Sequence, residues 1–140
     1  KHNFLVFVEE IDSDGNVIGY GFVEEKYENQ KDKWFSDDDC GIVEATNREV
    51  EEALIKEAKR RGFKNGVKVN SFVHNEILTI SQEHEIEYIA PLDSLFFGKN
   101  GSKLVVVYKK GKWAEIIEET KEMTIEQISK ELGYNIKIVK

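Results

Sequence analysis

The chain has 140 residues, of which 40% are hydrophobic and 34% charged, and its formal net charge is −7. This length is typical of one domain with a hydrophobic core, and the hydrophobic content argues against a disordered protein. A single cysteine, Cys40, excludes an intramolecular disulfide and a cysteine-based metal cluster, which favours a reducing compartment. Because the longest apolar runs have the length of a strand, we expect no membrane-spanning segment and a cytoplasmic protein.

The acidic residues are concentrated in the first third of the chain. Residues 1–49 contain 5 Lys/Arg and 13 Asp/Glu, whereas residues 50–140 contain 15 and 14. Such an asymmetry can steer a basic partner toward the acidic segment and repel nucleic acid. An acidic surface that only keeps the protein soluble is an equally open alternative.

Two strands joined by a tight turn are predicted at the start of the chain. Phe4–Ile11 is rich in β-branched and aromatic residues, Val17–Glu25 alternates apolar side chains, and an Asp-Gly pair lies between them. Gly19 and Gly21 fall on one face of the second strand, where they indicate a bulge or the close approach of another element. We therefore expect an N-terminal β-hairpin.

The segment Lys26–Asp39 has no sustained period and is predicted to be a polar loop, followed by a short strand over Cys40–Ala45. Trp34 and Phe35 either anchor this loop on the core, which is the favoured interpretation, or are exposed contacts of the kind that dominate interfaces. In the second case the loop and the preceding acids form a surface for a protein partner. That candidate surface consists of Glu24, Glu25, Glu28, Trp34, Phe35, Asp37, Asp38 and Asp39.

The longest helical pattern of the chain is Thr46–Phe63. Thr46 and Glu49 form a capping box, and apolar residues then recur at i, i+4 and i+8 along one face. Gly62 follows a basic last turn and is suited to the left-handed conformation that ends a helix, with Phe63 packing back onto it. The capping box, the apolar face and the terminal glycine all predict the same helix.

Five or six short strands are predicted after this helix, with turns every eight to twelve residues. Such spacing is typical of a small, strongly bent antiparallel sheet or barrel, and we expect an SH3-like barrel over Gly66–Ile117. The predicted strands are Val67–Val73, Glu76–Ser81, Glu85–Ile89, Asp93–Phe97, Lys103–Tyr108 and Trp113–Ile117.

A second, shorter helix is predicted near the end of the chain. Thr124 and Gln127 form another capping box, Gly133 ends the pattern, and Ile136–Val139 can add a last strand. We expect this helix to close the core. The predicted fold is thus α+β in one folding unit: an acidic hairpin and loop over residues 1–45, a central helix over 46–63 and a strand-rich region over 64–140.

The sequence contains no set of residues that predicts catalysis or a cofactor. His2, His74 and His84 are scattered without metal-ligand spacing, and the acidic neighbours of Cys40 disfavour a reactive thiolate. No phosphate loop, dinucleotide motif or nucleophile elbow is present. A metal-dependent hydrolase that uses His74 and His84 is the least favoured function.

The main alternative to a protein-binding function is sequestration of a small molecule, such as a nucleotide, between the sheet and the long helix. The residues expected to line that pocket are Arg60, Arg61, Tyr88, Phe97 and Trp113. Nucleic-acid binding is disfavoured because the pI is about 5.1 and no aromatic-basic RNA-binding motif occurs. Two basic patches nevertheless occur: Lys56, Lys59, Arg60, Arg61, Lys64 and Lys68 around the helix end, and Lys109, Lys110 and Lys112 beside Trp113.

Three segments of the chain support a resemblance to known proteins. They are GKWAEII at Gly111–Ile117, MTIEQISKELGYNIKIVK at Met123–Lys140 and the predicted helix at Glu49–Phe63. They resemble segments of small, uncharacterised proteins encoded by bacteriophages and prophages. The resemblance covers roughly half of the chain and carries no catalytic residue. The resemblance implies a bacterial cytoplasmic setting and a non-enzymatic inhibitor that binds a host or defence-system protein. The sequence leaves the oligomeric state of this chain open.

Overall fold

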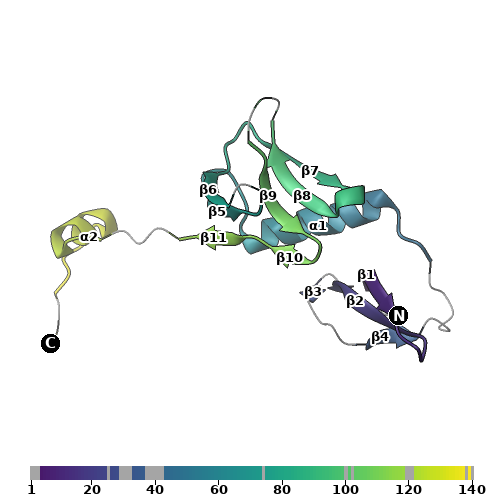
Figure 1. Ribbon diagram of the computed structural model, residues 1–140. Helices are drawn as coiled ribbons and strands as arrows, with labels where there is room; N and C mark the ends of the chain where they lie inside the picture. Colours follow the sequence, from purple (N-terminus) through teal and green to yellow (C-terminus); the bar gives the residue numbers. More distant parts are fainter. Residues whose placement is uncertain are drawn as a thin grey trace.

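A computed structural model of the chain describes residues 4–24, 26–28, 33–36, 43–73, 75–99, 101, 103–118, 122–137 and 139. These residues form an α+β architecture with three antiparallel sheets and two α-helices (Figure 1). The predicted fold class is therefore confirmed at this level.

The first sheet is N-terminal and is built around its second strand. β2 (Asn16–Val23) pairs antiparallel with β1 (Phe4–Ile11), as the hairpin prediction requires. β2 also pairs with β3 (Lys26–Glu28) and β4 (Lys33–Ser36) on its other side. The loop predicted over this segment is thus partly wrong, because short runs without apolar alternation became strands by pairing with the free edge of β2.

Two glycines let β1 and β2 approach each other closely. A Cβ atom at Gly19 would lie 1.9 Å from the carbonyl oxygen of Phe7, and one at Gly21 would lie 2.0 Å from that of Leu5. No side chain fits at such distances, so the backbone of β1 occupies the space that a Cβ would need. The predicted close approach at these two positions is confirmed.

The long helix, α1 (Asn47–Arg61), begins and ends as predicted. Thr46 and Glu49 make both hydrogen bonds of the capping box, and Gly62 ends the helix with φ of 97°. The N–H of Phe63 donates to the carbonyl of Ala58 at 3.1 Å, which satisfies one of the last helical carbonyls. The short strand expected just before the helix does not occur in its described part, which has no regular structure over residues 43–45.

The strands that follow α1 form two open sheets. The first has the order β11-β5-β6 and the second the order β10-β9-β8-β7, with a short 3-10 helix, η1, after β7. No closed barrel is present in the part of the chain that the structure describes. The bounds are β5 (Lys68–Ser71), β6 (Glu76–Thr79), β7 (Glu85–Ile89), η1 (Ala90–Leu92), β8 (Ser94–Gly98), β9 (Val105–Lys109), β10 (Lys112–Trp113) and β11 (Glu115–Ile117).

One predicted strand, Trp113–Ile117, is divided between these two sheets. Its first part pairs with β9 as β10, and its second part pairs with β5 as β11. The break is at Ala114, whose N–H donates to the carbonyl of Val107 at 2.7 Å. The strand therefore passes from one sheet to the other, and this links the sheets without closing a barrel.

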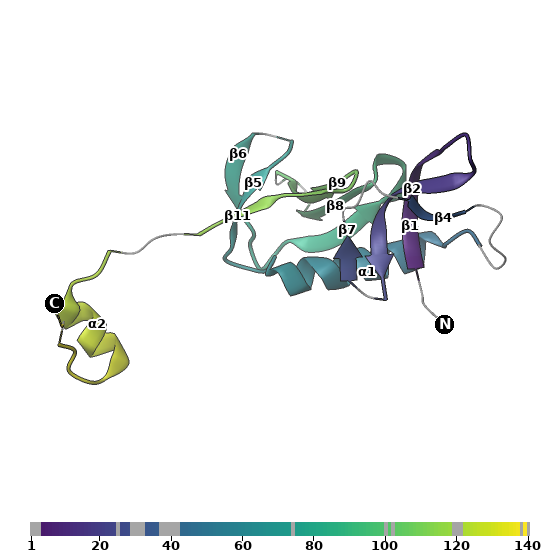
Figure 2. The same ribbon diagram turned by 90° about the horizontal axis from the view of Figure 1, so that it is seen from below.

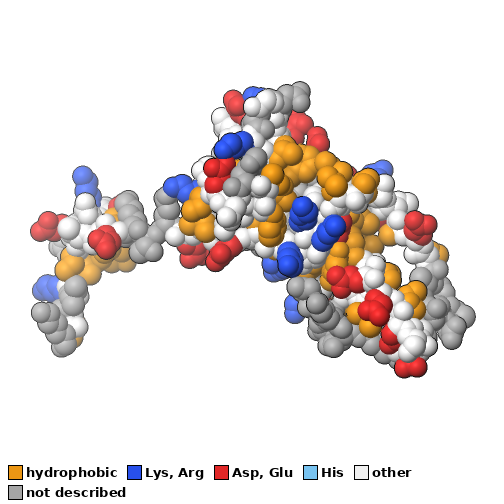
Figure 3. Space-filling model, in the orientation of Figure 1, with side chains coloured by type: hydrophobic (Ala, Val, Ile, Leu, Met, Phe, Trp, Pro, Cys, Tyr) orange, Lys and Arg blue, Asp and Glu red, His pale blue; other side chains and the backbone are white. Residues whose placement is uncertain are grey.

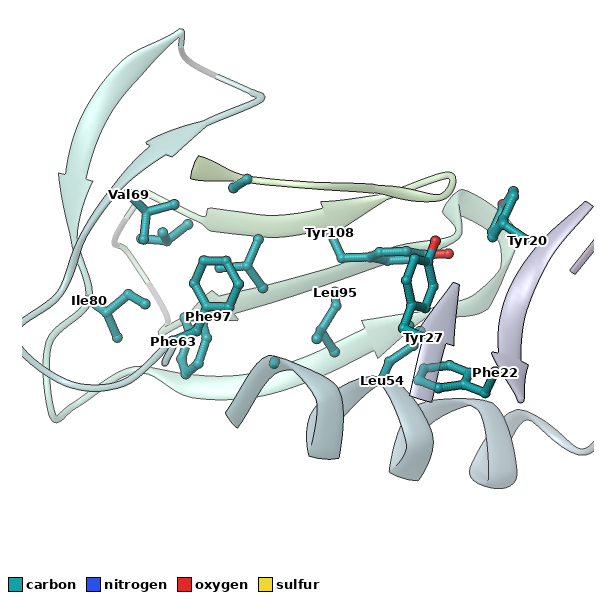
Figure 4. Close-up of a cluster of buried hydrophobic side chains, with 14 residues drawn as sticks. Tyr20, Phe22, Tyr27, Leu54, Phe63, Val69, Ile80, Leu95, Phe97 and Tyr108 are labelled. Atoms are coloured by element: carbon teal, nitrogen blue, oxygen red, sulfur yellow. The ribbon is translucent and has the colours of Figure 1, made fainter. Parts of the chain in front are cut away.

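The hydrophobic core lies where α1 meets the β7–β10 sheet (Figure 4). Leu54 and Ala58 of α1 are fully buried in one cluster with Leu95 and Phe97 of β8. The N-terminal sheet extends the same core with aromatic side chains, which include Tyr20, Phe22 and Tyr27. The three sheets and α1 thus share one core.

The second helix, α2 (Ile125–Leu132), lies apart from the rest of the molecule in both ribbon views (Figures 1 and 2). Its capping box and its left-handed Gly133 are present as predicted, but none of its eight residues, all described, is buried. The expectation that it closes the core is therefore wrong. The last strand expected over Ile136–Val139 is also not formed by the residues described there. Neither described helix is long and apolar enough to cross a membrane.

Candidate functional site

A partly buried carboxylate, that of Asp93, joins the N-terminal sheet to the rest of the protein. Asp93 accepts hydrogen bonds from the hydroxyl groups of Tyr20 at 2.5 Å, Tyr88 at 2.8 Å and Tyr108 at 3.2 Å. The three tyrosines come from β2, β7 and β9, so one side chain connects elements that are distant in sequence. Hydrogen bonds to an ionised acceptor are stronger than neutral ones, which makes this cluster a firm attachment point.

The backbone around Asp93 fixes the position of its carboxylate. Asp93 follows η1 in the left-handed conformation, with φ of 42°, and its N–H donates to the carbonyl of Ala90 at 3.0 Å. Its own carbonyl accepts from the N–H of Lys110 at 2.9 Å. Burial, followed by the hydrogen bond to Asp93, raises the pKa of Tyr20 and of Tyr88 well above the ordinary value. The tyrosines therefore stay protonated and act as donors.

A second carboxylate, which is buried, lies on α1. The side chain of Glu57 is fully buried, and it accepts from Arg60 at 2.6 and 2.7 Å and from Arg61 at 2.8 Å. Burial opposes ionisation of Glu57, but the hydrogen bonds from both arginines outweigh it and hold the pKa of this carboxyl below its ordinary value. The carboxylate is thus charged and paired.

Arg61 extends this ion pair into an aromatic stack. Its guanidinium carbon lies 4.7 Å from the ring centroid of Trp113 and 5.5 Å from that of Tyr27. The hydroxyl of Tyr27 in turn donates to the carbonyl of Gly111 at 2.9 Å. Cation–π contacts of this geometry are favourable, so Arg61 fastens β3 of the N-terminal sheet to the β9–β10 hairpin.

These two clusters form the joint between the N-terminal sheet and the body, the latter comprising α1 and strands β5 to β11. Each of the two carboxylates accepts three hydrogen bonds from tyrosines or arginines of the protein itself. The joint therefore fixes one sheet against the other and leaves binding to the surfaces beside it.

An open groove of about 780 Å³ runs beside the joint, between the N-terminal sheet and α1. It contains acids and bases from both sides, so it has no single charge. Its lining consists of Val23, Glu24, Lys26, Glu28, Lys56, Glu57 and Arg60.

The residues of the predicted protein-binding surface occupy different places. Glu24 and Glu28 line the groove, whereas Trp34 is half-buried and donates from Nε1 to the carbonyl of Gly19 at 2.8 Å. This hydrogen bond agrees with the interpretation of Trp34 as an anchor. Phe35 pairs with Val17 through the β4 backbone. Glu25 and Asp37, Asp38 and Asp39 lie outside the described residues, so the acidic surface stays a prediction.

The residues predicted for a small-molecule pocket are distributed over separate environments. Arg60 lines the groove, Arg61 lies on Trp113, and Tyr88 belongs to the Asp93 cluster. Phe97 is buried in the core beneath α1. Only one of the five predicted residues therefore lines the groove.

The histidines predicted for the least favoured function do not form a described metal site. The Nδ1 of His84 accepts a hydrogen bond from the N–H of Ser81 at 3.0 Å, so this ring caps a turn. His74 and Cys40 lie outside the described residues. Among the residues that the structure does describe, no three His, Cys, Asp or Glu side chains gather in a way that could hold a metal ion.

Sequence reasoning missed the two carboxylates of the joint, although one of them has a recognisable signal. Glu57 occupies position i+7 of the apolar stripe that contains Val50 and Leu54, and a charged residue at such a position needs a partner. Asp93 has no comparable signal, because its tyrosine partners come from three separate strands. Only the tertiary structure brings them together.

No family model, no curated protein and no solved structure matches this chain. The resemblance to phage-encoded proteins consequently stays a prediction, and the functional argument depends on the geometry described above.

Proposed function

We propose that this chain is a non-enzymatic binding protein, and that its partner is a protein whose basic surface docks on the acidic N-terminal sheet. One observation carries the proposal: within the acidic first third, the described residues 4–24, 26–28 and 33–36 form a sheet of their own. Exposed acids of that sheet include Glu9, Glu10, Asp14 and Glu24. An extended surface of one charge sign raises the association rate of a partner of the opposite sign.

The way in which the sheet is mounted also supports this function. The Asp93 cluster and the Arg61 stack fix the sheet on the body, so its acidic surface is presented in one orientation. A surface that is fixed before binding loses less conformational entropy when the partner docks. Following the resemblance to phage proteins, we propose that the partner is a bacterial host or defence protein and that binding inhibits it.

The test is an affinity capture from bacterial lysate that compares three forms of the tagged protein by mass spectrometry. These are the unmodified chain, the variant Glu24→Lys/Glu28→Lys and a matched control, Glu115→Lys/Glu126→Lys, which carries the same change in charge away from the groove. We expect one stoichiometric partner that the control retains and the groove variant loses. The captured amount should fall as salt rises from low to moderate concentration, because exposed charges are then screened.

A partner that is captured equally by the groove variant and by the unmodified chain would contradict the acidic-surface assignment. Loss of the partner with both variants would attribute binding to total charge rather than to this surface. Thermal unfolding of each variant tests whether the changes leave the fold intact.

A second candidate function, sequestration of a small anion, is favoured by the groove itself. Lys26, Lys56 and Arg60 line it together, and its volume of about 780 Å³ lies in the range of small-molecule sites. A nucleotide bound there should raise the unfolding temperature in a saturable manner, and Lys26→Ala should weaken that effect. If no nucleotide of a panel raised the unfolding temperature, this candidate function would be excluded.

A further inference from the structure

The β7–β10 sheet has an inner face against α1 and an outer face directed away from it. Residues directly opposite each other in an antiparallel pair share a face, so the register assigns the paired side chains; Val107, at the irregularity between β8 and β9, has no partner in it. Tyr88, Leu95, Tyr108 and Trp113 lie in one row on the inner face, within the core. In Figure 1, α1 lies behind this sheet, and the outer face is turned toward the viewer.

The middle of the outer face is apolar. Phe96 lies there opposite Val106; neither belongs to the cluster beneath α1, and both are largely covered by neighbouring side chains, at 8% and 4% exposure. Leu104 packs beside Phe96 over Gly98, where an added Cβ would lie 2.6 Å from the Leu104 side chain. Ile89 and Leu104 are 37% and 39% exposed, and the space-filling view shows hydrophobic side chains gathered over β7 and β8 (Figure 3).

Charged residues of opposite sign border this apolar strip on its two sides. Glu85 and Glu87 project from β7, whereas Lys109 and Lys112 project from β9 and β10. Lys109 and Lys112 lie directly opposite each other, an arrangement of like charges that is unfavourable in an isolated sheet. These four side chains make no ion pair with any residue that the structure describes, whereas the nearby Lys99 is paired with Glu83 at 2.8 Å.

We propose that the outer face of the β7–β10 sheet binds the same face of a second copy of this chain. The acidic pair and the basic pair lie at opposite ends of a diagonal across the sheet. Lys109 lies in the same row as Ile89, and Ile89 is two residues further along β7 than Glu87. Phe96 lies between the two pairs. A two-fold axis close to Phe96 therefore brings the acids of each copy onto the lysines of the other.

Symmetry makes this arrangement self-complementary. In a two-fold interface the same patch is used by both copies, so each attractive contact is formed twice. A patch with an apolar centre and a charged rim has the composition of protein–protein interfaces. An axis in the other diagonal direction would place acids on acids and lysines on lysines, so the charges also select the orientation.

A hollow on the acidic side of the strip has room for the lysines of the second copy. Its volume is about 420 Å³. Its lining combines three acids, one lysine that is already paired with Glu83, and apolar groups: Glu83, Glu85, Glu87, Phe96, Gly98, Lys99 and Leu104. Lysine side chains can lay their aliphatic stems on such apolar groups while the ammonium groups reach the carboxylates. This surface is separate from the acidic N-terminal sheet, so the proposal is independent of the proposed function.

The test measures molecular mass by sedimentation equilibrium for two charge-reversed variants. We expect the unmodified chain to reach twice its monomer mass of 16.2 kDa. Glu85→Lys/Glu87→Lys makes both rims basic and Lys109→Glu/Lys112→Glu makes both rims acidic, so each variant alone should be monomeric. Mixed in equal amounts, the two variants should form a heterodimer, because each rim then meets its opposite.

Several outcomes would overturn this proposal. An unmodified chain that stays monomeric up to millimolar concentration would do so, as would a dimer that persists in both charge-reversed variants. Failure of the mixed variants to associate would exclude the predicted pairing of rims. The matched control Glu115→Lys/Glu118→Lys should remain dimeric, and its dissociation would attribute the effect to net charge. Circular dichroism of each variant tests whether the monomers are folded.

Discussion

The two helices of this protein have the same local signals and different tertiary environments. α1 and α2 both begin with a threonine capping box and both end at a left-handed glycine. α1 buries Leu54, Glu57 and Ala58 against the sheets, whereas no residue of α2, which is described over its whole length, is buried. Leu132 of α2 is 52% exposed, although Leu54 of α1 is 0% exposed.

This difference separates what defines a helix from what stabilises it. Capping groups and glycine determine where a helix begins and ends, because they satisfy backbone groups near in sequence. Most of the stability of a short helix comes from packing of its apolar face, and an eight-residue helix has little stability by itself. α1 and α2 can therefore be compared by matched substitutions.

The largest effect is expected from removing a buried apolar side chain. Leu54→Ala should lower the free energy of unfolding by about 3 kcal/mol, because it leaves a cavity beneath the β7–β10 sheet. Ile128→Ala on α2 should change it by less than about 0.5 kcal/mol, as expected for a position outside the core. Chemical denaturation measures both, and equal losses would show that α2 packs on the body in solution.

A smaller effect is expected from neutralising the buried carboxylate of α1. Glu57→Gln removes the charge that both arginines contact and should cost about 2 kcal/mol at pH 7. Glu126→Gln, the matched change on α2, should leave the free energy of unfolding unaltered. Both are measured by urea unfolding at neutral pH.

The pH dependence of the Glu57 effect follows from the direction of its pKa shift. Its pKa is lowered in the folded protein, so the unfolded chain binds a proton first as the pH falls. The stability contributed by Glu57 is therefore complete above its unfolded pKa, about 4.3, and is lost as the pH falls through the folded value. The difference between the unmodified chain and Glu57→Gln should shrink below about pH 4. A difference that stays constant down to pH 2 would contradict the assigned pairing.

The smallest effect is expected at the helix caps. Thr46→Ala should lower the free energy of unfolding by about 1 kcal/mol, because the N–H of Glu49 loses its acceptor. Thr124→Ala should reduce the helicity of residues 125–132 without changing the global unfolding transition. NMR chemical shifts of α2 and thermal unfolding of the whole chain distinguish these results, and a cap effect of the same size on global stability in both helices would contradict the comparison.

Local patterns predicted most elements but not their partners. The hairpin of β1 and β2 and both helices agree with the predictions, because their signals lie within a few residues of each other. The predicted strand Trp113–Ile117 is divided between two sheets at Ala114, and nothing in its periodicity indicates a change of partner. β3 and β4 were missed for the opposite reason: pairing with β2 gives them a structure that their own residues do not favour.

The sequence by itself determined the helix boundaries, the turns, the class of fold and the concentration of acidic residues at one end of the chain. These properties depend on local hydrogen bonds, apolar periodicity and composition. The tertiary structure alone decided that three tyrosines meet Asp93, that Arg61 lies on Trp113 and that α2 is left without a packed face. Each of these depends on contacts between residues far apart in sequence, whose geometry is set by the packing of whole elements.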